Sequence, residues 1–146
     1  MKFSIATLLT VAASSVTSVV AQKANIALPT NGSDVQAGKD LLMKIDRPNF
    51  QSSAEEVAIV LGLTSCNPTC RPPQDGIGPG SILYKGPFNP KYKDGFPMLQ
   101  PHENFTVHVP SETRKGTAQI SLIQFDLVGA SLGPNLAYDA VYVNVV

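Results

Sequence analysis

The fold is decided by residues 104–128, NFTVHVPSETRKGTAQISLIQFDLV. Apolar and polar side chains alternate in the first part of this stretch, where Phe105, Val107 and Val109 are the apolar members. A period of two residues indicates a strand with one buried face. Pro110 ends this strand because it has no N–H to donate. The polar segment 111–116 then predicts a tight hairpin loop, and the apolar residues that follow it predict a second strand.

The same alternation recurs along the chain and predicts further strands at residues 24–28, 40–46, 55–65, 81–84 and 139–146. In segment 55–65 we expect Val57, Ile59 and Leu61 on one face; the other face is also apolar, as in a central strand. About seven short strands and no helix of three turns predict an all-β fold. We expect an antiparallel β-sandwich of immunoglobulin or fibronectin type, in preference to a closed barrel.

The first residues have the pattern of a targeting segment. Met1-Lys2-Phe3 is a short basic start, residues 5–20 form an apolar segment rich in Ala, Ser and Thr, and Val19-Val20-Ala21 ends on small residues. This pattern predicts a secretory signal peptide, residues 1–21, cleaved after Ala21. The alternative is a membrane anchor, which the short length and the many Ser and Thr residues disfavour. We therefore expect one extracellular β-sandwich domain, residues 22–146, without a membrane span.

The charge of this mature chain is nearly balanced. The full sequence has eleven basic and eleven acidic side chains, so removal of Lys2 leaves a net charge of −1. Nucleic acids and anionic membranes both need a basic face. The composition therefore argues against either as a partner.

Cys66 and Cys70 are the two cysteines, within Cys-Asn-Pro-Thr-Cys. In a secreted chain such a pair predicts a disulfide. A loop this short contributes only about 2 kcal/mol in the chain-entropy model. The bond would be a local clip, unlike the inter-sheet bridge of antibody domains. A metal site at the pair would need further ligands, and no His or other Cys lies nearby in sequence.

Two segments match the N-glycosylation sequon. Asn31 belongs to Asn-Gly-Ser in a predicted turn, and Asn104 belongs to Asn-Phe-Thr at the start of the stretch 104–128. Asn104 and Thr106 are two residues apart, so both point away from the apolar face of their strand. Both asparagines are therefore candidate glycosylation sites.

The motifs that resemble catalytic or metal sites lack the context that chemistry requires. Segment 129–133, GASLG, matches the nucleophile elbow, but no helix and no later His follow it, so we interpret it as a turn. His102 and His108 have only Glu103 nearby to complete a metal site. A mature chain beginning at Gln22 lacks the N-terminal His of copper-dependent polysaccharide oxygenases. We predict no catalytic residue, metal or cofactor, and no enzyme; a hydrolase with two carboxylates facing across a cleft remains the weaker alternative.

A proline- and glycine-rich span, residues 66–101, carries a group of closely spaced aromatic residues. Tyr84, Phe88, Tyr92 and Phe96 are interleaved with lysines and prolines. Aromatic side chains on a stiff loop are good anchors for a partner, and they are the candidate binding surface. The alternative is that the loop folds back and its rings cover the edge of the sandwich. Stacking on a carbohydrate is a further use of such rings.

Four segments together resemble a known family: YKGPFNP (84–90), NFTVHVP (104–110), GTAQISL (116–122) and FDLVGA (125–130). The chain resembles the fungal necrosis-inducing secreted protein family. The resemblance implies a secreted, non-enzymatic effector that binds a host protein, such as a receptor-associated kinase, and modulates immune signalling or cell death. It implies no catalytic residues. The alternative function is an extracellular module that binds a polysaccharide or the cell wall.

Overall fold

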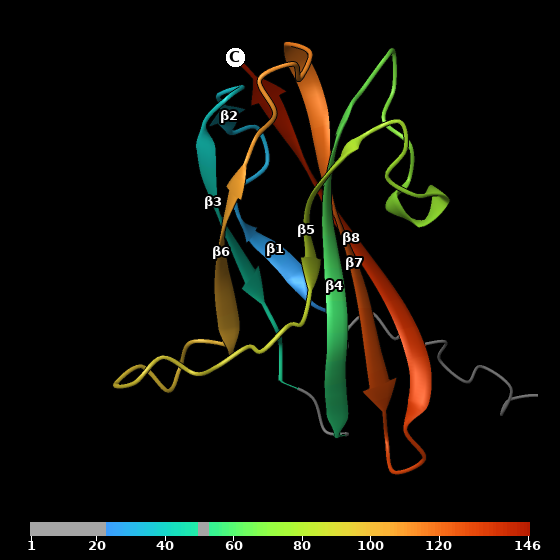
Figure 1. Ribbon diagram of the computed structural model, residues 1–146. Helices are drawn as coiled ribbons and strands as arrows, with labels where there is room; N and C mark the ends of the chain where they lie inside the picture. Colours follow the sequence, from blue (N-terminus) through green and yellow to red (C-terminus); the bar gives the residue numbers. More distant parts are fainter. Residues whose placement is uncertain (1–22, 50–52) are drawn as a thin grey trace, which may run out of the picture.

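The computed structural model describes residues 23–49 and 53–146 (Figure 1). Two β-sheets face each other and enclose the core, which confirms the predicted all-β, sandwich-like fold. The predicted signal peptide lies outside the described residues. Within the described ranges, no helix is long and apolar enough to cross a membrane.

The elements are β1 (Asn25–Leu28), β2 (Asp34–Val35), β3 (Asp40–Asp46), β4 (Ala54–Ser65), the 3-10 turn η2 (Pro73–Asp75), β5 (Ser81–Gly86), β6 (His102–His108), β7 (Gly116–Val128) and β8 (Gly133–Val145). One sheet has the order β1-β3-β6 and the other the order β2-β8-β7-β4-β5. Neighbouring strands are antiparallel, apart from the short parallel pair β2 and β8. Strands β5 and β6 are both edge strands.

The predicted hairpin between β6 and β7 is wrong, because the two strands belong to different sheets. The polar segment between them crosses from one sheet to the other, beginning where Val109 N–H donates to Lys39 O at 2.9 Å. Phe105 and Val107 of β6 and Ile120 and Leu122 of β7 therefore enter the same core from different sheets. Alternation identified the buried face of each strand but not the strand beside it, since a loop this short can also bridge two sheets about 10 Å apart.

The hairpin in this part of the chain joins β7 and β8 instead. Its turn, residues 129–132, is closed by Leu132 N–H donating to Gly129 O at 3.1 Å, and Gly129 has a φ of +75°. The segment GASLG is thus a turn, as its context predicts. Strand β8 begins at Gly133, six residues before the predicted start, and residues 133–138 pair with β7 along its lower half.

The core consists of the inward apolar side chains of both sheets. Those exposed by less than 2% of their surface include Met43, Ile45, Ile59, Leu61, Ile120 and Leu122. Val57 does not join them and is exposed, although we expected it on the same face as Ile59. A β-bulge between Glu56 and Ala58 inserts one residue opposite β7 and reverses the alternation, which turns Glu56 toward the interior.

The span from Cys66 to Gly80 packs against the upper end of β4. Cys66 and Cys70 form the predicted disulfide, with Cα atoms 4.5 Å apart. A Cβ at Gly62 would overlap the Ile77 side chain, and a Cβ at Gly80 would overlap the backbone oxygens of Leu63 and Ile77. Glycine at both positions therefore allows the loop to lie directly on the strand.

Candidate binding surface

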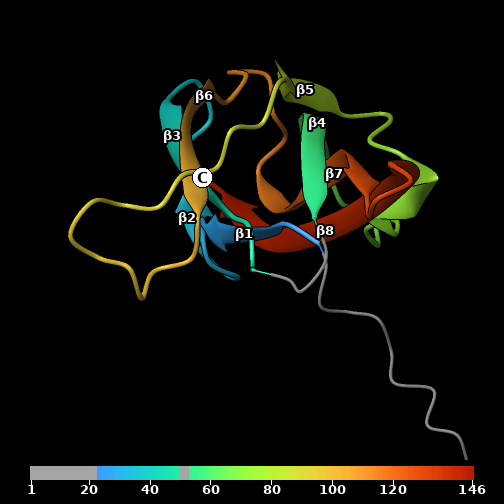
Figure 2. The same ribbon diagram turned by 90° about the horizontal axis from the view of Figure 1, so that it is seen from below.

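A loop between β5 and β6 projects sideways from the molecule, and it is drawn in yellow at the left of Figures 1 and 2. Its base is fixed by a pair of backbone hydrogen bonds: Lys91 N–H donates to His102 O, and His102 N–H donates to Lys91 O, both at 3.0 Å. Residues 91–100, called the binding loop below, are all exposed to solvent. The next residue, Pro101, is buried again.

The binding loop exposes large apolar side chains. Tyr92 and Phe96 are each 53% exposed, Met98 is 94% exposed, and Leu99 is also exposed. Two turns give the loop a defined shape, because Phe96 N–H donates to Lys93 O and Leu99 N–H donates to Phe96 O, both at 3.0 Å. Lys93 Nζ lies 4.9 Å from the centre of the Phe96 ring. The tip thus presents an apolar group with a cation beside it.

The four aromatic residues of the predicted binding surface divide into two pairs. Phe88 is 1% exposed and belongs to the core, and Tyr84 is half-buried with its ring 4.6 Å from that of Phe105. Tyr92 and Phe96 face solvent. The alternative, in which the rings cover the sandwich, therefore holds for Tyr84 and Phe88. Tyr92 and Phe96 are exposed, and their role in binding a partner stays a prediction.

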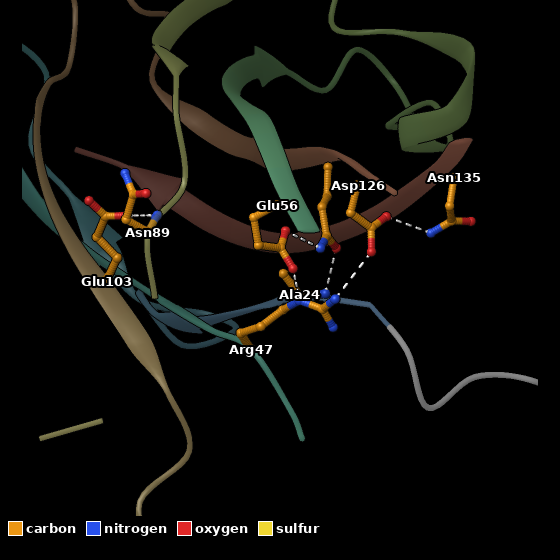
Figure 3. A network of polar contacts seen from close by, with 8 residues as sticks. Ala24, Arg47, Glu56, Asn89, Glu103, Asp126 and Asn135 are labelled. Atoms are coloured by element: carbon orange, nitrogen blue, oxygen red, sulfur yellow. Dashed lines mark hydrogen bonds and ion pairs between the residues drawn. The ribbon is translucent and has the colours of Figure 1, made fainter. Parts of the chain in front are cut away.

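Polar contacts attach the loop region to the rest of the fold. Tyr92 Oη–H donates to Asn49 Oδ1 at 2.6 Å. Asn89 N–H donates to the Glu103 carboxylate at 2.6 Å, and Figure 3 shows this second bond. Partial burial, and then the negative charge of Glu103, raise the pKa of Tyr84 above its usual value. The Tyr84 phenol therefore stays protonated to a higher pH than an ordinary tyrosine, and its hydroxyl donates to Pro87 O at 2.8 Å.

A groove of about 720 Å³ lies between the binding loop and β6. It is lined by Asn89, Lys91, Tyr92, Lys93, His102, Glu103 and Asn104. These seven residues form what we call the Asn104 groove. It combines one aromatic ring with cationic, carboxylate and amide groups, so its chemistry suits a polar ligand that also has a face for stacking.

A second polar feature lies between the sheets, and it was not predicted from the sequence. Arg47, which follows β3, is 5% exposed, and its guanidinium contacts the carboxylates of Glu56 and Asp126 (Figure 3). The Arg47 Nη2 to Asp126 Oδ2 distance is 3.1 Å, and Asp126 has no exposed surface. The ion pair of Arg47 and Asp126 links the end of β3, in the three-stranded sheet, to β7, in the five-stranded sheet.

Further hydrogen bonds complete this Arg47 cluster. Asn135 Nδ2 donates to Asp126 Oδ1 at 2.8 Å, and Gln124 Nε2 donates to Glu56 Oε2 at 2.7 Å. Ala24 N–H in turn donates to Gln124 Oε1 at 2.7 Å, which fixes the start of β1. Gln124 and Asp126 continue the alternation that turns Ile120 and Leu122 inward, so the period of two could have identified them as buried. The apolar pattern alone did not mark them, because both side chains are polar.

A hollow of about 450 Å³ opens beside the Arg47 cluster, with Glu55, Glu56, Phe88 and Pro101 among its walls. Glu56 is held by Arg47 and Gln124. The Glu56 carboxylate thus serves an ion pair and its hydrogen bonds, an arrangement that fixes the two sheets relative to each other.

The two histidines lie at opposite ends of β6. His102 Nδ1 is 3.0 Å from Gln100 O, and His108 Nδ1 is 3.0 Å from Asp40 Oδ1, where both side chains are exposed. Among residues 23–49 and 53–146, no group of three His, Cys, Asp or Glu side chains is placed to hold a metal ion.

Together these features define a two-sheet sandwich that presents an exposed apolar loop from a rigid base. The chain belongs to the Nis1 family, whose profile matches residues 19–144. This agrees with the resemblance to necrosis-inducing secreted proteins, which the family name suggests. No curated protein matches the chain.

The fold is similar to those of several solved structures. They include a chitin binding domain from Burkholderia pseudomallei (12% identity, TM-score 0.51, covering 80% of this chain and 57% of that one). Others are a cellulose-active polysaccharide monooxygenase from M. thermophila (14%, 0.49, 79% and 54%) and fibronectin(III)-like modules of Clostridium thermocellum CbhA (9%, 0.39, 84% and 95%). The chain spans little more than half the length of the first two. At these identities the likeness is one of fold.

Proposed function

We propose that the protein is a secreted, non-enzymatic protein that binds a protein partner through the binding loop, residues 91–100. The observation that carries the proposal is the exposure of Tyr92, Phe96, Met98 and Leu99 within one loop whose base is hydrogen-bonded. Exposed apolar groups gathered in one place, with polar groups around them, mark surfaces that bind other molecules.

The shape of the loop supports the same function. Aromatic side chains and Met are enriched at the centres of protein interfaces, where they supply most of the binding energy. The turns at Phe96 and Leu99 and the bond from Tyr92 to Asn49 hold these side chains before a partner arrives. Little conformational entropy is then lost on binding. The resemblance to necrosis-inducing secreted proteins points to a host receptor-associated kinase as the partner to test.

The test is a direct binding measurement between the purified protein and a panel of purified domains of receptor-associated kinases. The variant Phe96→Ala/Met98→Ala removes two exposed side chains at the tip, and we expect it to weaken binding by about tenfold or more. Leu42→Ala is the matched control, because Leu42 is a comparably exposed apolar side chain on the outer face of β3. Binding by no member of the panel, or equal binding by the double variant and wild type, would reject the proposal.

The second candidate function is binding of an extracellular polysaccharide. It is favoured by the Asn104 groove, where Tyr92 offers an exposed ring beside hydrogen-bonding groups. The fold likeness to a chitin binding domain gives a substrate to try. Retention on chitin, glucan or cellulose that is lost in Tyr92→Ala would support it. Absence of retention on all three would reject it.

A further inference from the structure

The sequon asparagine Asn104 is part of the wall of the Asn104 groove. It lies on the outward face of β6, where Asn104 and Thr106 are both exposed. Two residues earlier, His102 is paired with Lys91 at the base of the binding loop. A glycan attached to Asn104 would therefore start between β6 and the loop, rather than on a separate face of the sandwich.

We propose that an N-linked glycan on Asn104 folds into the Asn104 groove and covers the base of the binding loop, at Lys91, Tyr92 and Lys93. The tip, at Phe96 and Met98, stays uncovered because neither residue belongs to the groove. This inference goes beyond the proposed function, since it concerns a modification and not a partner.

The groove suits the first sugars of such a glycan. Their hydroxyl and acetamido groups both donate and accept hydrogen bonds, and the groove offers donors at Lys91, Lys93 and Asn89 and an acceptor at Glu103. The exposed ring of Tyr92 supplies a flat apolar surface against which a pyranose face packs. A volume of about 720 Å³ falls within the range of small-molecule sites.

The attachment uses the sequon chemistry of the secretory pathway. The amide nitrogen Nδ2 of Asn104 bonds to the anomeric carbon of a lipid-pyrophosphate-linked oligosaccharide. The bond from that carbon to the pyrophosphate oxygen breaks, the lipid pyrophosphate leaves, and the amide loses one proton to a base of the transferase. No group is oxidised or reduced.

The second sequon provides an internal comparison. Asn31 lines a different hollow, of about 380 Å³, which includes Tyr142 and Asn144 and shares no residue with the Asn104 groove. Asn31 Oδ1 accepts a hydrogen bond from Tyr142 N–H at 2.7 Å. A glycan on Asn31 should therefore have no effect on the lysines of the binding loop.

The competing placement for the glycan is the outer face of the three-stranded sheet. Lys44 of β3 lies directly opposite Asn104, and the exposed Leu42 lies opposite Thr106. A glycan lying on this face would cover Lys44 and leave Lys91 and Lys93 open. The lysines therefore report which of the two placements occurs.

The experiment is lysine acylation of the full-length secreted protein, made in a host that attaches N-glycans, with the labelling of each lysine read by mass spectrometry. Wild type is compared with Thr106→Ala, which removes the sequon and retains Asn104. Thr106→Ser, which retains the sequon, and Asn31→Gln, which removes the other one, are the controls. We expect labelling of Lys91 and Lys93 to be several-fold lower in wild type, Thr106→Ser and Asn31→Gln than in Thr106→Ala.

Three results would overturn the inference: no glycan on Asn104, equal labelling of Lys91 and Lys93 in all four proteins, or protection of Lys44 in their place. Labelling uses no partner, so its failure leaves the proposed function standing. Conversely, the protection can be present in a protein that binds none of the kinase domains.

Discussion

The Arg47 cluster and the binding loop both depart from the usual rule that charged side chains face water and apolar ones are buried. The cluster has charged side chains inside, and the loop has apolar side chains outside. The cluster places three charged side chains between the sheets, where Arg47 and Asp126 are almost completely buried. The loop places apolar side chains in water, where Met98 is 94% exposed. Buried charge is costly to desolvate and must be fully paired, which makes the cluster sensitive to any change. Exposed loop side chains contribute little to folding, which leaves them free to serve a partner.

The largest effect is expected in the cluster. Asp126→Ala leaves Arg47 with one fewer carboxylate in a buried site, and loss of one partner of such a pair costs about 3–5 kcal/mol of the free energy of unfolding. Urea unfolding measures this change. Asp40→Ala is the control, since the Asp40–His108 pair is exposed and should change stability by less than about 1 kcal/mol. Equal effects of the two substitutions would show that burial does not set the cost.

A second test compares two phenylalanines eight residues apart. Phe88→Ala empties a core position and should cost about 3 kcal/mol, near the lower end for such truncations. Phe96→Ala should lie within about 0.5 kcal/mol of wild type, as for most exposed positions. Thermal and urea unfolding give both values. In partner binding the order should reverse, with Phe96→Ala reducing affinity and the folded fraction of Phe88→Ala retaining it.

A smaller effect is expected where the loop after Cys70 lies on β4. Gly80→Ala places a Cβ against the backbone oxygens of Leu63 and Ile77, and we expect a loss of about 1–3 kcal/mol. Gly78→Ala should be nearly neutral, because the space around Gly78 is open. A wild-type midpoint of urea unfolding for Gly80→Ala would show that the loop does not rest on the strand.

The smallest effect concerns Tyr84. Its raised pKa means that folding favours the neutral phenol. The resulting stability is fully present below the unfolded-state pKa of about 10 and is lost as pH rises through the folded-state value. Absorbance titration, with Tyr84→Phe to assign the signal, measures this pKa. Glu103→Gln removes the second cause of the shift and should lower the pKa of Tyr84 while partial burial keeps it raised; an unchanged pKa would contradict the role of Glu103.

Apart from the two-residue β2, the strands could be predicted from the sequence, because alternation reports directly which side chains are buried. Their neighbours could not, as β6 and β7 show: the period of two is the same whether two strands pair in one sheet or face each other across the core. The bulge at Glu56–Ala58 also left no signal in the pattern, and it decides that Glu56 is turned inward and Val57 outward.

The candidate site was predicted in part. Proline spacing and aromatic content identified the segment, and both features apply equally to Phe88, which is buried, and to Phe96, which is exposed. Whether a ring in this segment is buried or exposed depends on its position relative to the contact between Lys91 and His102, which closes the base of the loop. These two residues are eleven apart in sequence. The proximity of Asn104 to the loop follows from the same contact. The residue pattern of a single segment does not contain information about this contact between two segments.

The hydrogen bond from Ala24 to Gln124 joins positions separated by 100 residues, and the ion pair from Lys23 to Asp139 by 116. Strand β1 therefore completes its contacts only after the later strands β7 and β8 have been made. Closing such long loops is entropically costly, and chains dominated by distant contacts fold slowly. During synthesis the apolar faces of β1 and β3 stay uncovered until β7 and β8 are made, so these strands should depend on chaperones up to that point.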